Sequence, residues 1–355
     1  MPSAFEEVLK EKKEFVWKEI EKYLSDLNFF PENPEIAEKY KDLLSFHREI
    51  TSAYPERRGK YIRPTLLLLT AEAMGAQEKT ALKTAAAMQT SEDWILIHDD
   101  FEDDSLQRRG APALHRIYGK ELAINAGDSL HVLMWKMLWD NTKVLGPKKA
   151  EEVACEFYQM LKRTTFGQTV EIKWAKENKT ELENEDIFLI LDGKTSYYTI
   201  AGPMRLGAII GNADKNELKK LYFFGQLLGR CFQIKDDLLD LTSDFKGLKK
   251  QKGSDIIEGK RTLMLMHLLK AAKKKDKEKL KVILEKNKEE KTEKEVLKVI
   301  EMMKSYGSLS YAQNIAENLA EEAKEYFDNE LLFLENNPAR KNLRLAVDFV
   351  LHRDY

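Results

Sequence analysis

Hydrophobic residues recur along the chain at intervals of three and four positions, the spacing that places them on one face of an α-helix. In residues 4–26, for example, Phe5, Val8 and Leu9 begin such a face and Ile20 continues it. The same pattern predicts helices over residues 35–53, 63–75, 80–104, 122–141, 151–175, 186–211, 216–240, 309–328 and 342–351. No segment alternates with the two-residue period of a strand. We therefore expect an all-α fold, built as one large helical bundle.

Two further features of the pattern bear on this architecture. Pro64 in the first turn and Gly75 at the end frame a helix that is apolar nearly all round, so it should be buried. Residues 273–291 are rich in Lys and Glu and are expected to form a solvated helical hairpin. Since no Ser-, Gly- or Pro-rich linker interrupts the chain, residues 1–355 are predicted to form a single domain.

The composition narrows the function classes. The chain has 355 residues and a formal net charge of −2, and this near-neutral balance argues against a nucleic-acid binder, which needs a basic face. Only Cys155 and Cys231 are present, so no disulfide framework is expected. The N-terminus is acidic where a signal peptide would be basic, and no apolar run approaches the roughly 20 residues of a membrane span. We expect a soluble, cytoplasmic protein.

A five-residue acidic pattern, DDxxD, occurs twice, as residues 99–103 and as residues 236–240. On a helix, Asp99 lies one turn below Asp103, and such like charges are unfavourable unless a cation neutralises them. The pattern therefore predicts divalent metal held between two facing helices. Paired carboxylates suit Mg²⁺, which keeps several waters and is completed by substrate phosphates. The alternative is that each pattern is a plain helix surface or terminus.

Basic residues at three places in the chain suggest bound anions. Arg108 and Arg109 follow the first one, and two guanidinium groups can clamp different phosphates. Lys60 and Arg63 lie at the start of the helix expected to be buried, where they oppose its dipole, so a bound anion explains them best. Lys194 is predicted in mid-helix, a position that also suggests a nearby anion. The alternative for Arg108 and Arg109 is incidental charge on a surface loop.

Together these residues resemble the trans-isoprenyl diphosphate synthases (polyprenyl synthetases), and among them the archaeal-type short-chain geranylgeranyl and farnesyl diphosphate synthases. Residues 98–110 are similar to the first aspartate-rich motif of the family and residues 232–240 to the second. Further motifs follow in family order, namely Gly59-Lys60-x-x-Arg63-Pro64, Gly167-Gln168, Lys194-Thr195 and Gly253 to Lys260. The resemblance implies the isoprenoid synthase type I fold, with antiparallel helices around a central cavity.

The resemblance also implies a role for each matching position. The main ligands of three Mg²⁺ ions, for which Mn²⁺ can substitute, would be Asp99, Asp103 and Asp236, supported directly or through water by Asp100, Asp237 and Asp240. The allylic diphosphate would be held by Arg108, Lys194 and Lys250, with Lys260 close by. The isopentenyl diphosphate would be held by Lys60, Arg63 and Arg109. The developing allylic cation would face Thr195, Gln233 and the carbonyl of Lys194, helped by Tyr198.

The implied reaction is a prenyl transfer. The metal ions and the surrounding cations polarise the allylic diphosphate until its C–O bond ionises. The isopentenyl double bond then attacks the allylic cation, and a proton leaves, to the released pyrophosphate. This chemistry needs no His or Cys nucleophile, so His98 is expected to pack or orient.

Two positions depart from the family pattern. Glu92 stands where many relatives carry a His or Gln that donates to isopentenyl diphosphate, and an ionised carboxylate cannot donate. We hypothesise that Gln89, on the same helical face, replaces that donor. Lys249-Lys250 stands where Gly-Lys is usual, which keeps a lysine in the loop.

Product length is expected to depend on the helix before the first motif. Trp94, five residues before Asp99, is large enough to form the floor of the tunnel in which the family grows its product, whereas Ser91 is too small to block it. The alternative is an ordinary core tryptophan. We predict C20 geranylgeranyl diphosphate first and C15 farnesyl diphosphate second.

Other functions and the assembly remain open at this point. A catalytically silent subunit of a heteromeric synthase usually lacks one acidic motif, and a class I terpene cyclase has no use for a second diphosphate site. The apolar region from Leu130 to Leu138 and the resemblance suggest a homodimer.

Overall fold

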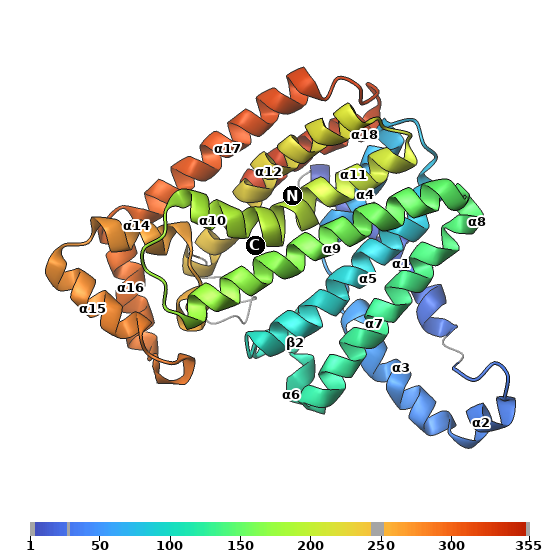
Figure 1. Cartoon of the computed structure of the whole chain (residues 1–355), viewed down its shortest axis with the longest axis horizontal. Coiled ribbons are helices and arrows are strands. Elements are labelled where there is room, and N and C mark those ends of the chain that lie inside the picture. Colours follow the sequence, from blue (N-terminus) through green and yellow to red (C-terminus); the bar gives the residue numbers. More distant parts are fainter. Residues whose placement is uncertain (1–3, 27–28, 243–251, 353–355) are drawn as a thin grey trace. The chain divides into compact units, whose positions relative to one another are not determined.

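The computed structural model of the chain describes residues 4–26, 29–242 and 252–352, and most of these are helical (Figure 1). The all-α prediction is confirmed. The elements in chain order are α1 (Ala4–Ser25), α2 (Pro34–Lys39), α3 (Lys41–Glu56), α4 (Ile62–Ala73), α5 (Glu78–Glu102), β1 (Gln107–Arg108), β2 (Ala111–Pro112), α6 (Leu114–Tyr118), α7 (Lys120–Asp140), α8 (Thr142–Leu145), α9 (Pro147–Lys176), α10 (Asn184–Ile190), η1 (Leu191–Ala201), α11 (Gly202–Ile210), α12 (Lys215–Thr242), α13 (Ser254–Glu258), α14 (Leu263–Ala271), α15 (Lys274–Leu284), η2 (Lys288–Glu290), α16 (Glu293–Ser305), α17 (Ser308–Glu330) and α18 (Pro338–His352).

Three segments differ from the helices predicted by periodicity. The helix expected over residues 35–53 is divided at Tyr40, whose N–H bonds to the carbonyl of Ile36 and ends α2. The helix expected over residues 186–211 contains the eleven-residue π-helix η1. Residues 107–112 form a two-stranded antiparallel hairpin, which is too short to show a two-residue period in the sequence.

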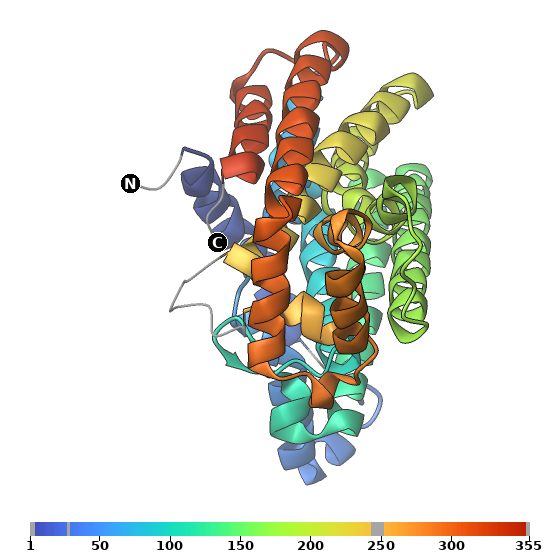
Figure 2. The ribbon, with the colours of Figure 1, turned by 90° about the vertical axis from the view of Figure 1, so that its left-hand side faces the viewer.

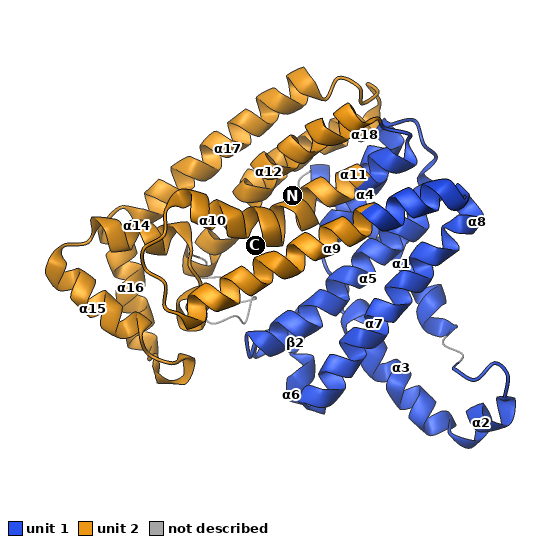
Figure 3. Ribbon diagram, in the orientation of Figure 1, with its two compact units in different colours: residues 1–155, 206–213, 247–249 blue, residues 156–205, 214–246, 250–355 orange. Residues whose placement is uncertain are grey.

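The chain divides into two compact units (Figure 3). Unit 1 comprises residues 1–155, 206–213 and 247–249, and unit 2 comprises residues 156–205, 214–246 and 250–355. The divisions fall within the helices α9 and α11 and between α11 and α12. The prediction of a single domain over the whole chain stays a prediction.

Unit 1 is organised around α5, which packs against α7, α4 and α1. Small side chains make this close approach possible, because residues 85–87 of α5 are all fully buried alanines. The buried Lys12 of α1 donates to Glu72 of α4 at 2.8 Å and to Glu78 of α5 at 2.5 Å, so its charge is matched by two carboxylates. The helix predicted to be buried, α4, is buried along most of its length. These contacts fix the N-terminal half of α5, the helix that carries the first acidic motif at its other end.

Unit 2 is organised around α12, which packs against η1, α17 and α18 (Figures 1 and 2). Its buried side is a stripe at three- and four-residue spacing, formed by Leu221, Phe224, Leu228, Cys231, Ile234 and Leu238. A buried polar contact lies beside this core, where Glu156 accepts from Arg205 at 2.7 Å and from the hydroxyl of Tyr197. In the described part of the chain, no helix has the length and apolar character needed to cross a membrane.

Candidate active site

The first acidic motif ends α5. Asp99 and Asp100 lie in the last turn and Asp103 is the C-cap residue. The carbonyl end of a helix carries partial negative charge, so carboxylates there are unfavourable unless a cation is bound. The second motif, residues 236–240, likewise lies in the last two turns of its helix, α12. Both motifs therefore combine negative side chains with a negative helix end, which is the electrostatic setting of a cation site.

Asp100 is fully buried and has fixed partners within unit 1. The Tyr54 hydroxyl donates to its Oδ2 at 2.6 Å. Arg108 donates through Nε to Oδ1 at 2.9 Å and to Oδ2 at 3.0 Å, and through Nη2 to Oδ1, so two of its nitrogens and both carboxylate oxygens take part in the pair. Burial, followed by the charge of Asp100, raises the pKa of Tyr54, so this hydroxyl stays a donor. Arg108 also lies 3.6 Å from Asp99, so one guanidinium touches both adjacent carboxylates of the motif.

Arg109 is anchored beside this group. Its Nη1 donates to Asp93 at 2.7 Å and to the carbonyl of Tyr54 at 3.0 Å. Its Nη2 lies 3.5 Å from Glu92, and Arg63 lies 3.1 Å from the other oxygen of Glu92. The structure thus brings together Arg63 and Arg109, two of the three cations expected to hold isopentenyl diphosphate.

The backbone at Gly59 makes room for this cluster. A Cβ at position 59 would lie 2.7 Å from Nη2 of Arg109, so any larger residue would displace the guanidinium. Lys60, the third expected cation, follows directly and is exposed. Gln89 is fully buried, and its Nε2 donates to Asp93 at 3.3 Å. Its proposed donation to a diphosphate stays a prediction, and in this structure the amide hydrogen is directed to Asp93.

Trp94 lies between α5 and α7. Its ring stacks on His131 with the centroids 4.3 Å apart and meets His98 edge-on at 6.1 Å. Gly127 of α7 leaves space for the His98 ring, because a Cβ at position 127 would lie 2.4 Å from that ring. His98 therefore packs against its neighbours here, and Trp94 is supported from one side by an aromatic partner.

Unit 2 links its functional candidates through a short chain of hydrogen bonds. The Thr195 hydroxyl donates to Gln233 at 2.8 Å, and Gln233 donates to Asp237 at 2.7 Å. Burial raises the pKa of Asp237 to about 7, against the lowering effect of the Gln233 bond. The nearby charges of Asp236 and Glu171 raise it as well. A buried carboxylate whose ionisation is disfavoured by two neighbouring acids is a fitting environment for a cation.

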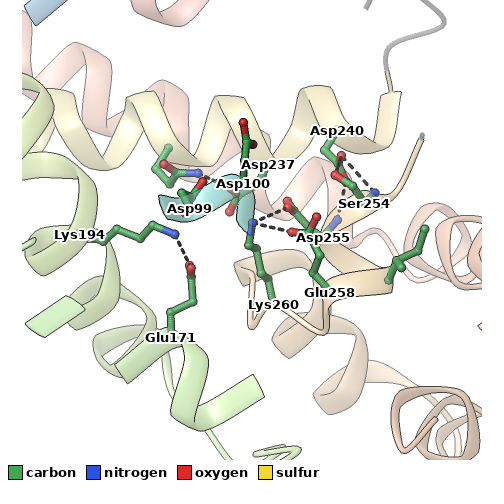
Figure 4. Close-up of polar contacts among 12 residues, drawn as sticks. Asp99, Asp100, Glu171, Lys194, Asp237, Asp240, Ser254, Asp255, Glu258 and Lys260 are labelled. Atoms are coloured by element: carbon green, nitrogen blue, oxygen red, sulfur yellow. Dashed lines mark hydrogen bonds and ion pairs between the residues drawn. The ribbon is translucent and has the colours of Figure 1, made fainter. Parts of the chain in front are cut away.

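The third acid of this motif is bound to the loop that follows. Asp240 accepts from the Ser254 hydroxyl at 2.6 Å and from the backbone N–H of Asp255 at 3.2 Å (Figure 4). Lys260 pairs with Glu258 at 2.7 Å and lies 3.7 Å from Asp255. Asp240 thus fixes the segment that carries Lys260. Lys250, also expected to bind the allylic diphosphate, lies outside the described residues.

Lys194 and Thr195 are carried by the π-helix η1. Lys194 points toward Glu171 of α9 and forms an ion pair with it (Figure 4). Gly167 of the Gly-Gln motif allows α9 and η1 to lie in close contact, because a Cβ at this position would lie 2.3 Å from the backbone nitrogen of Lys194. Tyr198, one turn on, is buried. A backbone–backbone contact therefore sets the position of the lysine.

The side chains of the two acidic motifs suit a divalent metal. Both motifs offer carboxylate oxygens, the hard ligands that Mg²⁺ prefers. Within residues 4–26, 29–242 and 252–352, no three Asp, Glu, His or Cys side chains converge closely enough to enclose an ion by themselves. That arrangement fits Mg²⁺, which usually takes one or two carboxylates and completes its shell with water and phosphate oxygens.

Several functional neighbours escaped the sequence analysis. Tyr54, Asp93 and Glu171 each bind a predicted site residue, and Ser254 binds Asp240. Asp93 adjoins Glu92, so two consecutive acids within a largely apolar predicted helix were a usable signal. Tyr54 carried no signal, because a buried tyrosine 46 positions from its partner looks like ordinary core.

Comparison with known proteins gives a consistent result. Residues 45–303 match the polyprenyl synthetase family. A short chain isoprenyl diphosphate synthase of Methanothermobacter thermautotrophicus is 36% identical over 297 residues, covering 84% of this chain and 87% of that protein. A geranylfarnesyl diphosphate synthase of Natronomonas pharaonis is 30% identical over 84% of this chain and 87% of that protein. The crystal structure of geranylgeranyl pyrophosphate synthetase from Pyrococcus horikoshii Ot3 has a TM-score of 0.81 and 30% identity, covering 99% of this chain and 100% of that one.

Proposed function

Because the chain belongs to the polyprenyl synthetase family and is a trans-prenyltransferase, we propose that it extends an allylic diphosphate with isopentenyl diphosphate to C20 geranylgeranyl diphosphate. The observation that carries this function is the match over residues 45–303, because that range contains both acidic motifs and every cation of the site. Neither alternative, a silent subunit of a heteromeric synthase or a class I terpene cyclase, is favoured by these matches.

Prenyl diphosphate synthases use divalent metal, which neutralises the diphosphate as it leaves. We propose Mg²⁺, three ions per active site, with Mn²⁺ as a substitute. Asp99 and Asp103 in unit 1 and Asp236 in unit 2 are the proposed direct ligands. Asp100, Asp237 and Asp240 have the neighbours described above, so their proposed role is support, either through water or by positioning.

The basic residues of the two units are proposed to hold the substrates. Arg108, fixed by its two-point contact with Asp100, holds the allylic diphosphate, together with Lys194, Lys250 and Lys260. Lys60, Arg63 and Arg109 hold the isopentenyl diphosphate. Arg109 suits this role because Asp93 and the Tyr54 carbonyl fix Nη1 while Nη2 remains directed to Glu92.

Thr195, Gln233 and the carbonyl of Lys194 are proposed to face the allylic cation, with Tyr198 behind them. Oxygen dipoles stabilise a developing positive charge, and the Thr195–Gln233–Asp237 chain supplies such oxygens with fixed orientation. The proton released after condensation is proposed to leave on pyrophosphate.

Product length is proposed to be set by Trp94, because its stacking on His131 makes it a rigid obstacle. The relatives cited above differ in product, since one is named for geranylfarnesyl and another for geranylgeranyl diphosphate, so overall identity does not decide the length. We place C20 first and C15 second.

We further propose a cytoplasmic homodimer. Both cysteines are free thiols, as expected in a reducing compartment. The residues suggested by the sequence are only partly suitable for an interface, because Leu130 and Leu138 are buried in unit 1. The other face of α7 exposes large apolar side chains instead, with Val132 69% and Trp139 73% exposed, and these form the proposed interface.

The function is tested with the purified chain, radiolabelled isopentenyl diphosphate and each allylic primer in turn, followed by chromatography of the product. Extension to C20 that stops on addition of EDTA and returns with Mg²⁺ is the expected result. Extension that requires a second protein would instead identify a silent subunit, and a cyclised hydrocarbon would identify a terpene cyclase.

A further inference from the structure

Glu92 lies between the two arginines proposed to hold isopentenyl diphosphate. One carboxylate oxygen is 3.1 Å from Nη1 of Arg63, and the other is 3.5 Å from Nη2 of Arg109. Each of these three side chains is less than one-fifth exposed. Guanidinium groups bind phosphate and carboxylate oxygens through the same N–H donors, so Glu92 occupies the positions that a phosphate would use.

The neighbouring acid, Asp93, is held quite differently. It is fully buried, and it accepts from Nη1 of Arg109 at 2.7 Å and from Gln89 at 3.3 Å. Oε2 of Glu92 and Nη2 of Arg109, by contrast, make no well-aligned hydrogen bond to any residue in the described ranges. Asp93 is thus a fixed anchor for Arg109, whereas Glu92 makes an ionic contact that a better ligand can replace.

We propose that Glu92 is a built-in counter-ion, which the diphosphate of isopentenyl diphosphate displaces from Arg63 and Arg109, and which thereby lowers the affinity for that substrate. This inference rests on the proposed function for the assignment of these arginines. An ionised carboxylate cannot donate to a phosphate, so after displacement it faces the bound anion with like charge. Asp93 acts as a positioning residue, because it keeps Arg109 oriented whether or not the substrate is present.

Neutralising either of the two adjacent acids is therefore expected to change the KM for isopentenyl diphosphate, but in opposite directions. Glu92→Gln, which keeps the shape and removes the charge, lowers the KM for isopentenyl diphosphate roughly tenfold, or about 1.4 kcal/mol. The KM for the allylic substrate serves as the reference, because neither Arg63 nor Arg109 is assigned to that substrate. Asp93→Asn raises the KM for isopentenyl diphosphate roughly tenfold, because Arg109 loses its anchor. Glu121→Gln, an exposed carboxylate of α7, is the matched control and changes neither constant.

A binding measurement separates this inference from the proposed function. Isothermal titration of isopentenyl diphosphate alone into each variant needs no turnover, and Glu92→Gln is expected to bind it more tightly than the wild type. Glu92→Asp, with a shorter side chain, is expected to show a smaller gain in affinity for isopentenyl diphosphate. It replaces Glu92→Gln in the test if that variant does not fold. Unchanged or weaker binding in the folded variant overturns the counter-ion role. Absence of condensation by the wild type, with the binding difference intact, overturns the proposed function instead.

Discussion

Asp100 and Arg108 form a two-point ion pair at the end of α5, in which both Nε and Nη2 of the arginine contact the same carboxylate. Asp99, the adjacent residue, meets that guanidinium only at 3.6 Å. The two neighbouring aspartates of the motif therefore differ in what they do for the protein. Asp100 is part of the buried structure that positions Arg108, whereas Asp99 makes the longer contact and is our proposed metal ligand.

Asp100→Asn is expected to lower the free energy of unfolding by about 3 kcal/mol, because it breaks a two-point ion pair whose carboxylate is fully buried. Asp99→Asn is expected to change stability by less than about 1 kcal/mol. It nevertheless lowers kcat roughly a hundredfold or more, since it removes a proposed metal ligand. Urea denaturation and steady-state kinetics on both variants measure the difference. Equal stability of the two would show that the ion pair is not structural.

Gly167→Ala is expected to destabilise unit 2 by about 1–3 kcal/mol, the usual cost of overpacking. Its Cβ would lie 2.3 Å from the backbone nitrogen of Lys194, so α9 and η1 must separate. Because Lys194 moves with η1, kcat should fall as well. Thermal melting and kinetics are compared with Thr165→Ala, an exposed position on the same helix that should be nearly neutral. An unaltered Gly167→Ala enzyme would contradict the backbone contact.

Trp94→Ala is expected to lengthen the product beyond C20, because it removes the proposed tunnel floor that stacks on His131. Tyr158→Ala, which removes an aromatic side chain that is 54% exposed on α9, should leave the chain length unchanged. Chromatography of the dephosphorylated products gives the answer. If Trp94→Ala and the wild type made products of the same chain length, Trp94 would be an ordinary core residue and not the tunnel floor.

The raised pKa of Asp93 predicts that the free energy of unfolding depends on pH. Burial raises its pKa from 3.8 to about 6, and the charge of Glu92 acts in the same direction, while Arg109 and Gln89 oppose. The unfolded chain therefore loses this proton near pH 4 and the folded chain only near pH 6. The stability contributed by the protonated form is complete below pH 4, declines as the pH rises to 6 and is constant above.

Asp93→Asn removes the titration of this carboxyl group and leaves the other titratable groups of the protein in place. The free energy of unfolding of the variant, relative to wild type, should therefore increase by up to about 3 kcal/mol between pH 4 and pH 7. Urea denaturation at half-unit pH intervals measures it. Parallel pH profiles for the two proteins would show that the pKa of Asp93 is close to its ordinary value.

The sequence predicted the helices well where periodicity and end signals agreed. Pro64 and Gly75 framed α4 correctly, since a proline in the first turn and a glycine at positive φ are local requirements. The hairpin of residues 107–112 was missed because two-residue strands leave no pattern. The π-helix was missed because a helical pattern read at 3.6 residues per turn does not distinguish the two helix types.

The site was predictable in its charges and not in its pairings. The acids and cations were visible as motifs, because closely spaced side chains of like charge have few roles other than binding ions of opposite charge. Which acid binds which cation depends on burial and distance in three dimensions. The Asp100–Arg108 and Glu92–Arg63 pairs and the Lys194–Glu171 pair therefore emerged only from the structure.

The eleven residues of η1 have a consequence for anyone aligning or redesigning this chain. A π turn accommodates roughly one residue more than an α turn, so side chains downstream of it fall out of phase with those upstream. A helical wheel drawn straight through residues 184–210 therefore assigns the wrong faces after Leu191. Shortening this stretch by a single residue would re-phase Lys194 and Thr195 relative to everything that follows them.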